Sequence, residues 1–281
     1  TAISVAFARN PMTSANLAWD LNQYSRGRFS IGLGSQIKPH ITRRFSMPWS
    51  QPAARMREYI QALRAIWRCW ENGEKLDFNG EFYTHNLMTP MFVPQKREYG
   101  APGVRLAAVG PRMTEVAAET ADGMIAHGFT TAKYLREVTL PAVERGLASA
   151  GRQRADFDIS APVFTVTGVD EAAFLQSKQA VQSQLAFYAS TPAYRPVLEL
   201  HGWGELQTEA HRLTREDRWQ EMGALISDEV LETFAVVAED IDALPGLLQA
   251  RYGELVDTWM CTAVTGDPQT QQKLVAAVQA D

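Results

Sequence analysis

The sequence predicts an α/β protein with a parallel sheet. Apolar, strand-like segments alternate with segments of helical periodicity along the chain, and no Greek-key turn spacing interrupts this order. With 281 residues and 46% hydrophobic composition, the chain can bury a full core. The six principal predicted strands are 1–8, 28–33, 104–109, 123–127, 159–167 and 255–262.

The amino-terminal part is predicted as strand, helix, strand and long loop. Residues 1–8 are apolar without clean alternation, which suits a strand buried on both faces. Pro11 breaks the strand, and apolar residues then recur at helical spacing over 12–24. After the short strand 28–33, residues 35–51 show no periodicity, and a long loop after a strand is usually functional.

The middle and carboxyl-terminal parts continue the alternation. An amphipathic helix over 52–72 buries its aromatic side chains as core packing and stops at Gly73. A β-hairpin excursion follows within about 74–95, with its turn at Asn79-Gly80. Residues 189–219 are polar, aromatic and broken by proline, so we expect a loop or lid there. Further helices are predicted at 112–121, 133–150, 170–188, 227–236 and 240–252, and at the carboxyl terminus.

The stretch 104–127 carries the clearest functional pattern. A buried strand ends at Val109, Gly110-Pro111 makes a tight turn, and a helix starts at once. The first N–H groups of a helix have no partner inside it, and the helix dipole adds to them, so this turn is a candidate anion site. An ordinary strand-turn-helix without a ligand fits the same pattern, and the stretch alone leaves both interpretations open.

Bulk properties exclude several classes of protein. The net charge of -5 and the absence of a basic block argue against non-specific nucleic-acid binding. The two cysteines and five histidines show no disulfide or metal-ligand spacing. No apolar run is long enough for a membrane span, and no signal peptide is present, so we expect a cytoplasmic protein without a metal or membrane.

Two sheet architectures fit alternating strands and helices. A doubly wound dinucleotide-binding sheet can be built from six strands, but Gly32-Leu-Gly-Ser-Gln36 lacks the third glycine of the dinucleotide fingerprint and opens no helix. A (β/α)8 barrel needs eight strands. The strand count by itself does not decide between them.

Several short motifs follow one another in a characteristic order. They are Gly27-Arg-Phe-Ser-Ile-Gly-Leu-Gly-Ser35, Arg57-Glu-Tyr59, Leu63-Arg-Ala-Ile-Trp67, Gly80-Glu-Phe-Tyr83, Ala107-Ala-Val-Gly-Pro111, Ala121-Asp-Gly123, Gly34-Ser-Gln-Ile-Lys-Pro-His-Ile-Thr-Arg-Arg44 and Phe187-Tyr-Ala-Ser-Thr-Pro-Ala-Tyr-Arg195. Together they resemble the luciferase-like monooxygenase superfamily, and most closely its actinobacterial oxidoreductases that use the deazaflavin coenzyme F-420. The resemblance runs from residue 1 to about 265.

The resemblance implies a single (β/α)8 TIM barrel domain of the bacterial luciferase type over 1–281. On that plan Thr1–Ala8 matches the third strand, so the first two strands and the first helix are expected to be lacking from the given chain. A short six-stranded variant is the alternative, although it would expose two strand edges. The family's third strand carries a cis peptide bond against the cofactor ring, which would fall at Ala2-Ile3 here.

The resemblance also implies the cofactor and substrate residues. Its fourth strand places residues at the cofactor's polyol and phosphate, its fifth-strand turn holds the phosphate, and its sixth strand ends near substrate. The implied cofactor residues are Ala2, Ile3, Gly34, Ser35, Gln36, His40, Ala108, Val109, Gly110 and Pro111. The substrate candidates are His127 and Arg195, with Tyr188, Tyr194, His201 and Trp203 as further wall residues. Arg195 is expected to pair either with a fixed carboxylate of the protein or with an anionic substrate.

The implied activity is hydride transfer between coenzyme F-420 and a small organic substrate in a cytoplasmic homodimer. Some deazaflavin enzymes carry an acid after the fourth strand, where this chain has Gln36, Ile37 and Lys38, so no catalytic residue is assigned. Two alternatives stay open: a monooxygenase that uses FMN and oxygen, and a non-catalytic flavin-binding protein. The basic residues Lys38, His40, Arg43 and Arg44 favour the anionic deazaflavin tail, or form a solvated surface run. The sequence does not identify the substrate.

Overall fold

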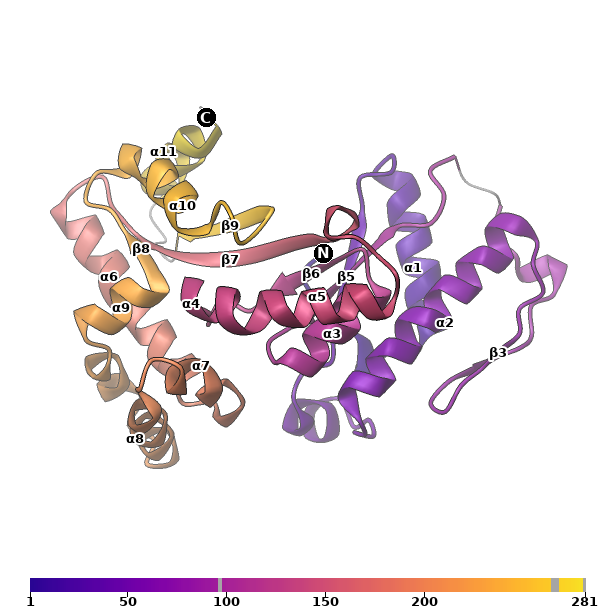
Figure 1. Cartoon of the computed structure of the whole chain (residues 1–281), viewed down its shortest axis with the longest axis horizontal. Coiled ribbons are helices and arrows are strands. Elements are labelled where there is room, and N and C mark those ends of the chain that lie inside the picture. The colour runs from indigo at the N-terminus through magenta and orange to yellow at the C-terminus, as the bar shows by residue number, and fades with distance from the viewer. Residues whose placement is uncertain (96–97, 264–267, 280–281) are drawn as a thin grey trace. The chain divides into compact units, whose positions relative to one another are not determined.

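The computed structural model describes residues 1–95, 98–263 and 268–279. This part of the chain divides into two compact units. Unit 1 comprises Thr1–Ile125 and Pro141–Asp158, and unit 2 comprises Ala126–Leu140 and Ile159–Asp281. Both units contain parallel strands joined through helices, which confirms the predicted α/β class (Figure 1).

The sheet of unit 1 runs in the order β1-β2-β5-β6. Strand β1 pairs with β2, and β2 with β5, in parallel, with Val5 opposite Gly34 and Leu33 opposite Leu106. Parallel strands covered on both faces are expected to be apolar throughout, and β2 is buried along most of its length. The strands are β1 (Ser4–Val5), β2 (Ser30–Gly34), β5 (Gly103–Ala108) and β6 (Gly123–Ala126).

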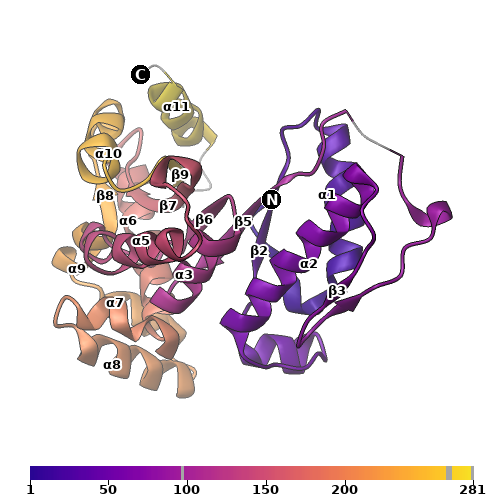
Figure 2. The ribbon, with the colours of Figure 1, turned by 45° about the vertical axis from the view of Figure 1, so that its right-hand side comes forward.

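Helices α1 (Pro11–Tyr24) and α2 (Pro52–Asn72) lie side by side in unit 1, as Figures 1 and 2 show. Asn10 caps α1 by accepting from the Thr13 N–H at 2.8 Å, and Pro11 occupies the first turn, where its missing N–H is not needed. The Trp67 indole on α2 donates to the Ala15 carbonyl of α1 at 3.2 Å. The predicted apolar face of α2 is therefore core packing.

Helices α3 (Pro111–Thr120) and α5 (Leu140–Ser149) also pack against each other. Gly146 on α5 has no side chain, and a Cβ there would collide with the backbone of Glu115 on α3. Arg145 and Glu115 form an ion pair at 2.8 Å beside this contact. Close helix approach therefore depends on the glycine.

The predicted hairpin excursion is present in unit 1. Strands β3 (Phe78–Asn79) and β4 (Thr84–His85) pair antiparallel. The Glu58 carboxylate of α2 accepts from the N–H groups of three turn residues at 2.9, 2.7 and 2.6 Å. Those residues are Glu81, Phe82 and Tyr83. A short turn, η3 (Pro90–Phe92), completes the excursion.

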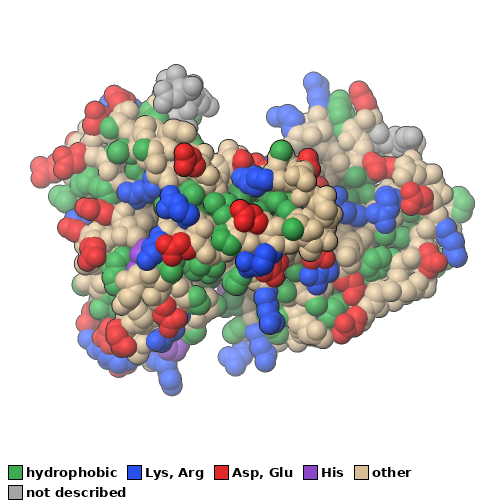
Figure 3. Space-filling view, in the orientation of Figure 1, with side chains coloured by type: hydrophobic (Ala, Val, Ile, Leu, Met, Phe, Trp, Pro, Cys, Tyr) green, Lys and Arg blue, Asp and Glu red, His purple; other side chains and the backbone are tan. Residues whose placement is uncertain are grey.

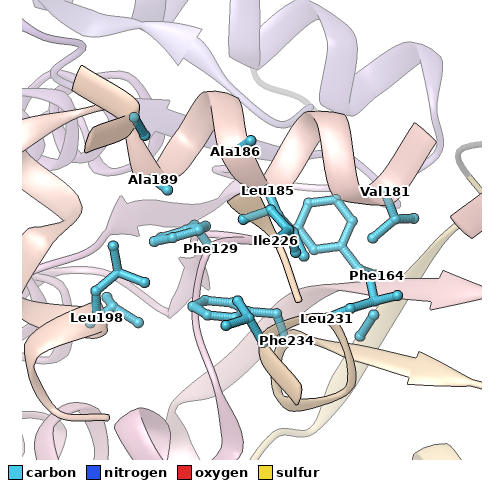
Figure 4. Close-up of a cluster of buried hydrophobic side chains, with 14 of the residues drawn as sticks. Phe129, Phe164, Val181, Leu185, Ala186, Ala189, Leu198, Ile226, Leu231 and Phe234 are labelled. Carbon is cyan, nitrogen blue, oxygen red and sulfur yellow. The ribbon is translucent and has the colours of Figure 1, made fainter. Parts of the chain in front are cut away.

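Unit 2 contains β7 (Asp158–Val166), which pairs in parallel with both β8 (Ala235–Val237) and β9 (Thr258–Ala263). Its core gathers aromatic and aliphatic side chains, among them Phe129, Phe164 and Phe234, with Phe129 stacked on Phe234 at 4.5 Å (Figure 4). Its helices and turns are α4 (Ala132–Tyr134), η4 (Leu135–Thr139), α6 (Glu171–Ala189), η6 (Pro192–Tyr194), α7 (Arg195–Glu199), α8 (Gly204–Arg215), η7 (Trp219–Leu225), α9 (Asp228–Phe234), η8 (Ile241–Ala243), α10 (Leu244–Tyr252) and α11 (Pro268–Gln279).

The prediction of one helix over 227–236 is wrong at its end. Helix α9 stops at Phe234, and β8 follows at once, with Val236 opposite Thr165 of β7. Apolar periodicity cannot separate a short buried strand from a helix end, and pairing with β7 decides the outcome here. The six predicted strands are present with shifted bounds, and β8 is a strand that the pattern missed.

Two predicted loops contain helical structure. Residues 189–219 were expected to be a loop or lid, but they form η6, α7 and α8, with Val197 and Leu198 buried in the core. The 35–51 segment contains η2 (His40–Arg44), whose Ile41 is fully buried. The predicted strand 1–8 shortens to β1, because Ala6–Ala8 form a turn, η1.

Charged side chains of both signs are interspersed on the face that Figure 3 shows. Exposed ion pairs such as those of Arg212 with Glu209 and Glu216 join residues three or four positions apart in the chain. Such pairs contribute little to stability individually. Of the helices in the described part of the chain, none combines the length and apolar composition needed to cross a membrane.

Candidate functional site

The predicted cofactor residues of unit 1 lie where its parallel strands meet. Gly34 ends β2, and Ser35 and Gln36 follow it. A Cβ at Gly34 would collide with the Ile3 side chain and would lie 3.7 Å from the Ala107 Cβ of β5. Three segments far apart in sequence are therefore brought together, as the family resemblance implies.

The peptide bond between Ala2 and Ile3 is cis. The resemblance placed a cis bond at this position, and the structure confirms its presence. The Thr1 amino group donates to the Ser30 carbonyl at 2.9 Å, which fixes this segment beside β2. Contact of Ala2 and Ile3 with a cofactor ring stays a prediction.

The turn after β5 has an open backbone. Gly110 is the N-cap residue of α3, and it has no side chain that could cap the helix. The N–H and hydroxyl of Thr114 both donate to the Gly110 carbonyl at 3.1 Å, so the turn is firmly held. A Cβ at Gly110 would meet no atom within 4 Å. The N–H groups at the start of α3 can therefore be approached by an anion.

The segment after β2 contains three further predicted cofactor residues. Gln36 adopts φ 61°, which is uncommon for a residue with a side chain, and the Ser35 hydroxyl donates to the Gln36 carbonyl at 3.1 Å. His40 is exposed at the start of η2. Contact of these three residues with a cofactor stays a prediction.

The 35–51 segment carries exposed basic side chains. Lys38, Arg43 and Arg44 are exposed, and none of the ion pairs recorded among the described residues involves them. Arg44 lies over the Phe45 ring at 5.3 Å. An un-neutralised basic segment attracts anionic groups.

His127 of unit 2 follows directly after β6 and uses both ring nitrogens. The Phe129 N–H donates to His127 Nδ1 at 3.0 Å. His127 Nε2 lies 3.1 Å from the Tyr194 hydroxyl. The two rings are tilted by 32° with centroids 4.5 Å apart, and Tyr188 contacts the imidazole edge-on at 4.8 Å. His127 is thus enclosed by aromatic side chains.

These hydrogen bonds assign the protonation state of His127. Because Nδ1 accepts a backbone hydrogen bond, the neutral imidazole carries its proton on Nε2 and donates it to the Tyr194 oxygen. Burial lowers the pKa of His127 to about 4, which keeps the ring neutral near pH 7. Burial, with a smaller contribution from Tyr188, raises the pKa of Tyr194 and keeps its hydroxyl protonated.

Arg195 is held by the protein itself. Its Nε donates to Glu199 Oε1 at 2.7 Å, and Nη1 lies near oxygens of Gln207 at 3.2 Å and Thr208 at 3.4 Å. Of the two alternatives for this side chain, the structure shows the fixed carboxylate. A substrate role for Arg195 stays a prediction without geometric support.

His201 and Trp203 form a second aromatic pair in unit 2. Their rings stack at 4.8 Å, and His201 Nε2 lies 2.9 Å from the Thr131 hydroxyl. Thr131 also caps α4 by accepting from the Tyr134 N–H at 3.1 Å. Burial lowers the pKa of His201. These contacts join two segments of unit 2 and indicate a structural role.

The pairing of His127 with Tyr194 was not predicted from sequence. The two residues are 67 positions apart, and no local pattern links them. The sequence marked Tyr194 only as a wall residue. A spatial contact of this kind has no periodic or motif signal.

The parallel α/β fold and the open turn after β5 point to a known family of proteins. The sequence model described as luciferase-like monooxygenase matches residues 1–251. The chain belongs to this family. Its parallel α/β fold also matches luciferase-like TIM-barrel enzymes of known structure over nearly the full chain.

The chain is similar to proteins of several organisms. An uncharacterized protein of Mycobacterium tuberculosis is 54% identical over 92% of this chain and 75% of its own length. A 5,10-methylenetetrahydromethanopterin reductase of Archaeoglobus fulgidus is 27% identical over 92% of this chain and 73% of its own. The structure of the coenzyme F-420 dependent tetrahydromethanopterin reductase of Methanopyrus kandleri superimposes with a TM-score of 0.77 at 18% identity, covering 98% of this chain and 80% of that one.

Proposed function

We propose that this protein is an oxidoreductase that uses the deazaflavin coenzyme F-420 to transfer hydride to or from a small organic substrate. Membership of the luciferase-like family supports a flavin-type cofactor. The names of the Methanopyrus kandleri protein and of an F-420-dependent secondary alcohol dehydrogenase of similar fold support the deazaflavin in particular. The (β/α)8 TIM barrel of the bacterial luciferase type is part of the same proposal.

The observation that carries the proposal is the open turn at Gly110. Its backbone would hold the cofactor phosphate, because no side chain caps the start of α3 and a Cβ at Gly110 would meet no atom within 4 Å. Gly34 and Ser35, next to the Ile3 side chain, would hold the polyol. These residues fit a phosphate-bearing cofactor of either kind, so the turn does not distinguish F-420 from FMN.

The basic segment favours F-420. Its tail is longer and more anionic than that of FMN, and Lys38, Arg43 and Arg44 are exposed without recorded ion pairs among the described residues. FMN ends at the phosphate and would leave these charges unused. The second candidate function, an FMN-dependent monooxygenase, therefore ranks lower.

The cofactor supplies the hydride, and the protein supplies binding, orientation and electrostatics. In this division of work the α3 turn of unit 1 binds the anionic part of the cofactor, and His127 of unit 2 is a substrate candidate by itself. His127 lies after the carboxyl end of β6, where barrel enzymes carry their active-site residues. A homodimer and a cytoplasmic location stay predictions.

Separate titrations with F-420 and FMN test the proposal. We expect tight binding of F-420, followed by a redox change of the bound cofactor in the presence of a substrate panel. Tight binding of FMN without binding of F-420 would contradict the proposal. Binding of either cofactor without turnover on a broad panel would instead favour a non-catalytic flavin-binding protein.

A further inference from the structure

Unit 1 contains a pocket that is bounded by helices α1 and α2 and by the excursion. Its volume is about 320 Å³. Met12 and Asn16 of α1, Trp70 of α2 and residues of the 87–92 segment line it, and all of them belong to unit 1. None of the lining residues is a predicted cofactor or substrate residue, and none belongs to a strand. The pocket is therefore distinct from the proposed cofactor site at the strand ends.

The walls of this pocket are mainly apolar. Leu87 and Phe92 line it, although their side chains are 77% and 78% exposed. Met12 and Met88 add flexible, polarisable thioether side chains, which adapt to the shape of a ligand. Exposed apolar side chains that gather at one place mark a binding surface. In the described part of the chain no Lys, Arg, Asp or Glu lines the pocket, so a neutral ligand fits it better than an ion.

The Trp70 indole adds a hydrogen-bond donor to these apolar walls. The residue is 4% exposed, and its Nε1–H has no hydrogen-bond partner among the described residues. Trp67, three positions earlier on α2, donates its Nε1–H to the Ala15 carbonyl at 3.2 Å. Trp19 also lacks a partner for its Nε1–H, but it does not line the pocket; it packs edge-on against Trp70 at 5.5 Å. Because buried N–H groups normally have an acceptor, we expect a pocket ligand to supply one to Trp70.

We propose that this pocket binds a small neutral molecule with an apolar body and one carbonyl group, whose oxygen accepts from Trp70 Nε1–H. The volume limits the apolar body. An apolar cavity of ~150 Å³ holds benzene, so the larger pocket in unit 1 has room for two fused rings or a short acyl chain. The carbonyl oxygen satisfies the Trp70 donor without bringing a charge between apolar walls. The inference concerns unit 1 alone and does not depend on the proposed function.

Titration with prodan tests the site on the whole chain in the absence of any cofactor. Prodan is a neutral dimethylaminonaphthalene with one propionyl ketone, and its emission moves to shorter wavelength when it leaves water. We expect saturable binding with a dissociation constant on the order of 100 μM or tighter. In proton–nitrogen correlation NMR spectra, the Trp70 indole N–H signal should move downfield as it gains an acceptor. The signal of Trp67, whose N–H is already bonded, should stay in place.

The variant that combines Leu87→Ser and Phe92→Ser tests the apolar walls. Both positions are exposed, so the fold should be kept. The loss of both side chains should weaken prodan binding at least about 10-fold, because they supply apolar contact area. Met91→Ser is the matched control, since Met91 precedes Phe92 in the chain and is 93% exposed but does not line the pocket. It should change the affinity less than about 2-fold.

Trp70→Phe tests the hydrogen bond separately from the apolar contacts. The variant keeps an aromatic ring but lacks the N–H donor, so the affinity for prodan should fall about 5-fold. Dimethylaminonaphthalene, which has the same fused rings without the ketone, should bind wild type and Trp70→Phe with affinities within about 2-fold of each other. Comparing the two ligands in one variant separates the hydrogen bond from the effect of the smaller ring on the shape of the pocket.

The results either support the site or overturn it. The absence of saturable prodan binding would overturn it, and so would binding that the Leu87→Ser and Phe92→Ser combination leaves unchanged or that Met91→Ser weakens equally. Equal losses of affinity for both naphthalenes in Trp70→Phe, or an unmoved Trp70 N–H signal at saturation, would overturn the role of the indole donor. Because neither F-420 nor FMN is present, these results are independent of the proposed function.

Discussion

The two candidate sites are built from different parts of the chain. In unit 1 the proposed phosphate site would consist of backbone N–H groups after one strand, and Gly110 would contribute by having no side chain. In unit 2 the site consists of two side chains, His127 and Tyr194, from segments 67 positions apart. A backbone site should tolerate most replacements that add no charge. A side-chain site should be sensitive to the loss of one atom.

The largest effect is expected for Gly110→Asp. An aspartate places a carboxylate where we propose that the phosphate binds, and repulsion between close like charges predicts a loss of F-420 affinity on the order of 100-fold. Equilibrium titration measures this. The fold should be kept, because Gly110 has φ -91° and ψ 161°, open space for a Cβ, and a position that favours Asp as helix cap.

Gly110→Asn is the matched control, since asparagine has nearly the same shape and the same capping ability without the charge. It should lower affinity much less than Gly110→Asp. Equal losses for the two variants would show that space rather than charge matters. Unchanged affinity in both would place the phosphate site elsewhere.

The next effect concerns His127 and pH. The unfolded chain binds a proton on His127 below about pH 6.5, whereas the folded protein binds it only near pH 4. The free energy of unfolding should therefore fall as the pH falls through this window, by about 3 kcal/mol from this side chain. His127→Gln lacks this contribution. Denaturant unfolding at pH 7 and pH 4 should show a smaller loss in the variant, and parallel losses would contradict the assigned neutral state.

Neutralising the basic side chains of the 35–51 segment should have a smaller effect on cofactor affinity. Lys38→Gln, Arg43→Gln and Arg44→Gln combined should weaken F-420 binding about 10-fold at low salt, because each exposed contact to an anionic tail contributes little alone. Added salt should reduce the difference from wild type. The control is a deazaflavin that lacks the anionic tail, which should bind both proteins equally. A salt-independent loss, or the same loss for the tail-free compound, would argue against a tail site.

The smallest effect is expected for Thr131→Val. This change removes the α4 cap and the hydrogen bond to His201 together. The free energy of unfolding should fall by about 1–2 kcal/mol. Thr131→Ser keeps the hydroxyl and should stay within about 0.5 kcal/mol of wild type. If both variants are equally stable, the Thr131 hydroxyl has no structural role in unit 2.

The contrast between a backbone site and a side-chain site also explains which features could be predicted from the sequence. The turn at Gly110, the helix end at Gly73 and the six strands follow from local patterns, and the structure contains all of them. The partner of His127 depends on the tertiary path of the chain, which no local pattern encodes. Strand β8 was missed because pairing with β7, rather than propensity, ends α9 at Phe234.

The helices within 189–219 were missed for a related reason. Prolines at 192 and 196 suggested a break, but Pro192 and Pro196 each stand in the first turn of a helix, where proline is tolerated. The many polar residues of these helices gave no sign in the sequence that Val197 and Leu198 are buried. Composition therefore predicted a lid where the chain forms part of the core.

The attachment of the hairpin to α2 has a consequence for how this protein can vary. Glu58 holds the turn through main-chain N–H groups, so replacing the side chains at 81, 82 or 83 by any residue except proline leaves those three bonds available. Only Gly80 is restricted by this contact, since a Cβ there would occupy the space of the Glu58 carboxylate. Glu58 and Gly80 thus fix the backbone of the turn whatever its side chains are, and the Tyr83 hydroxyl, which accepts from Arg55 Nε at 2.9 Å, adds the sequence-dependent part of the attachment to α2.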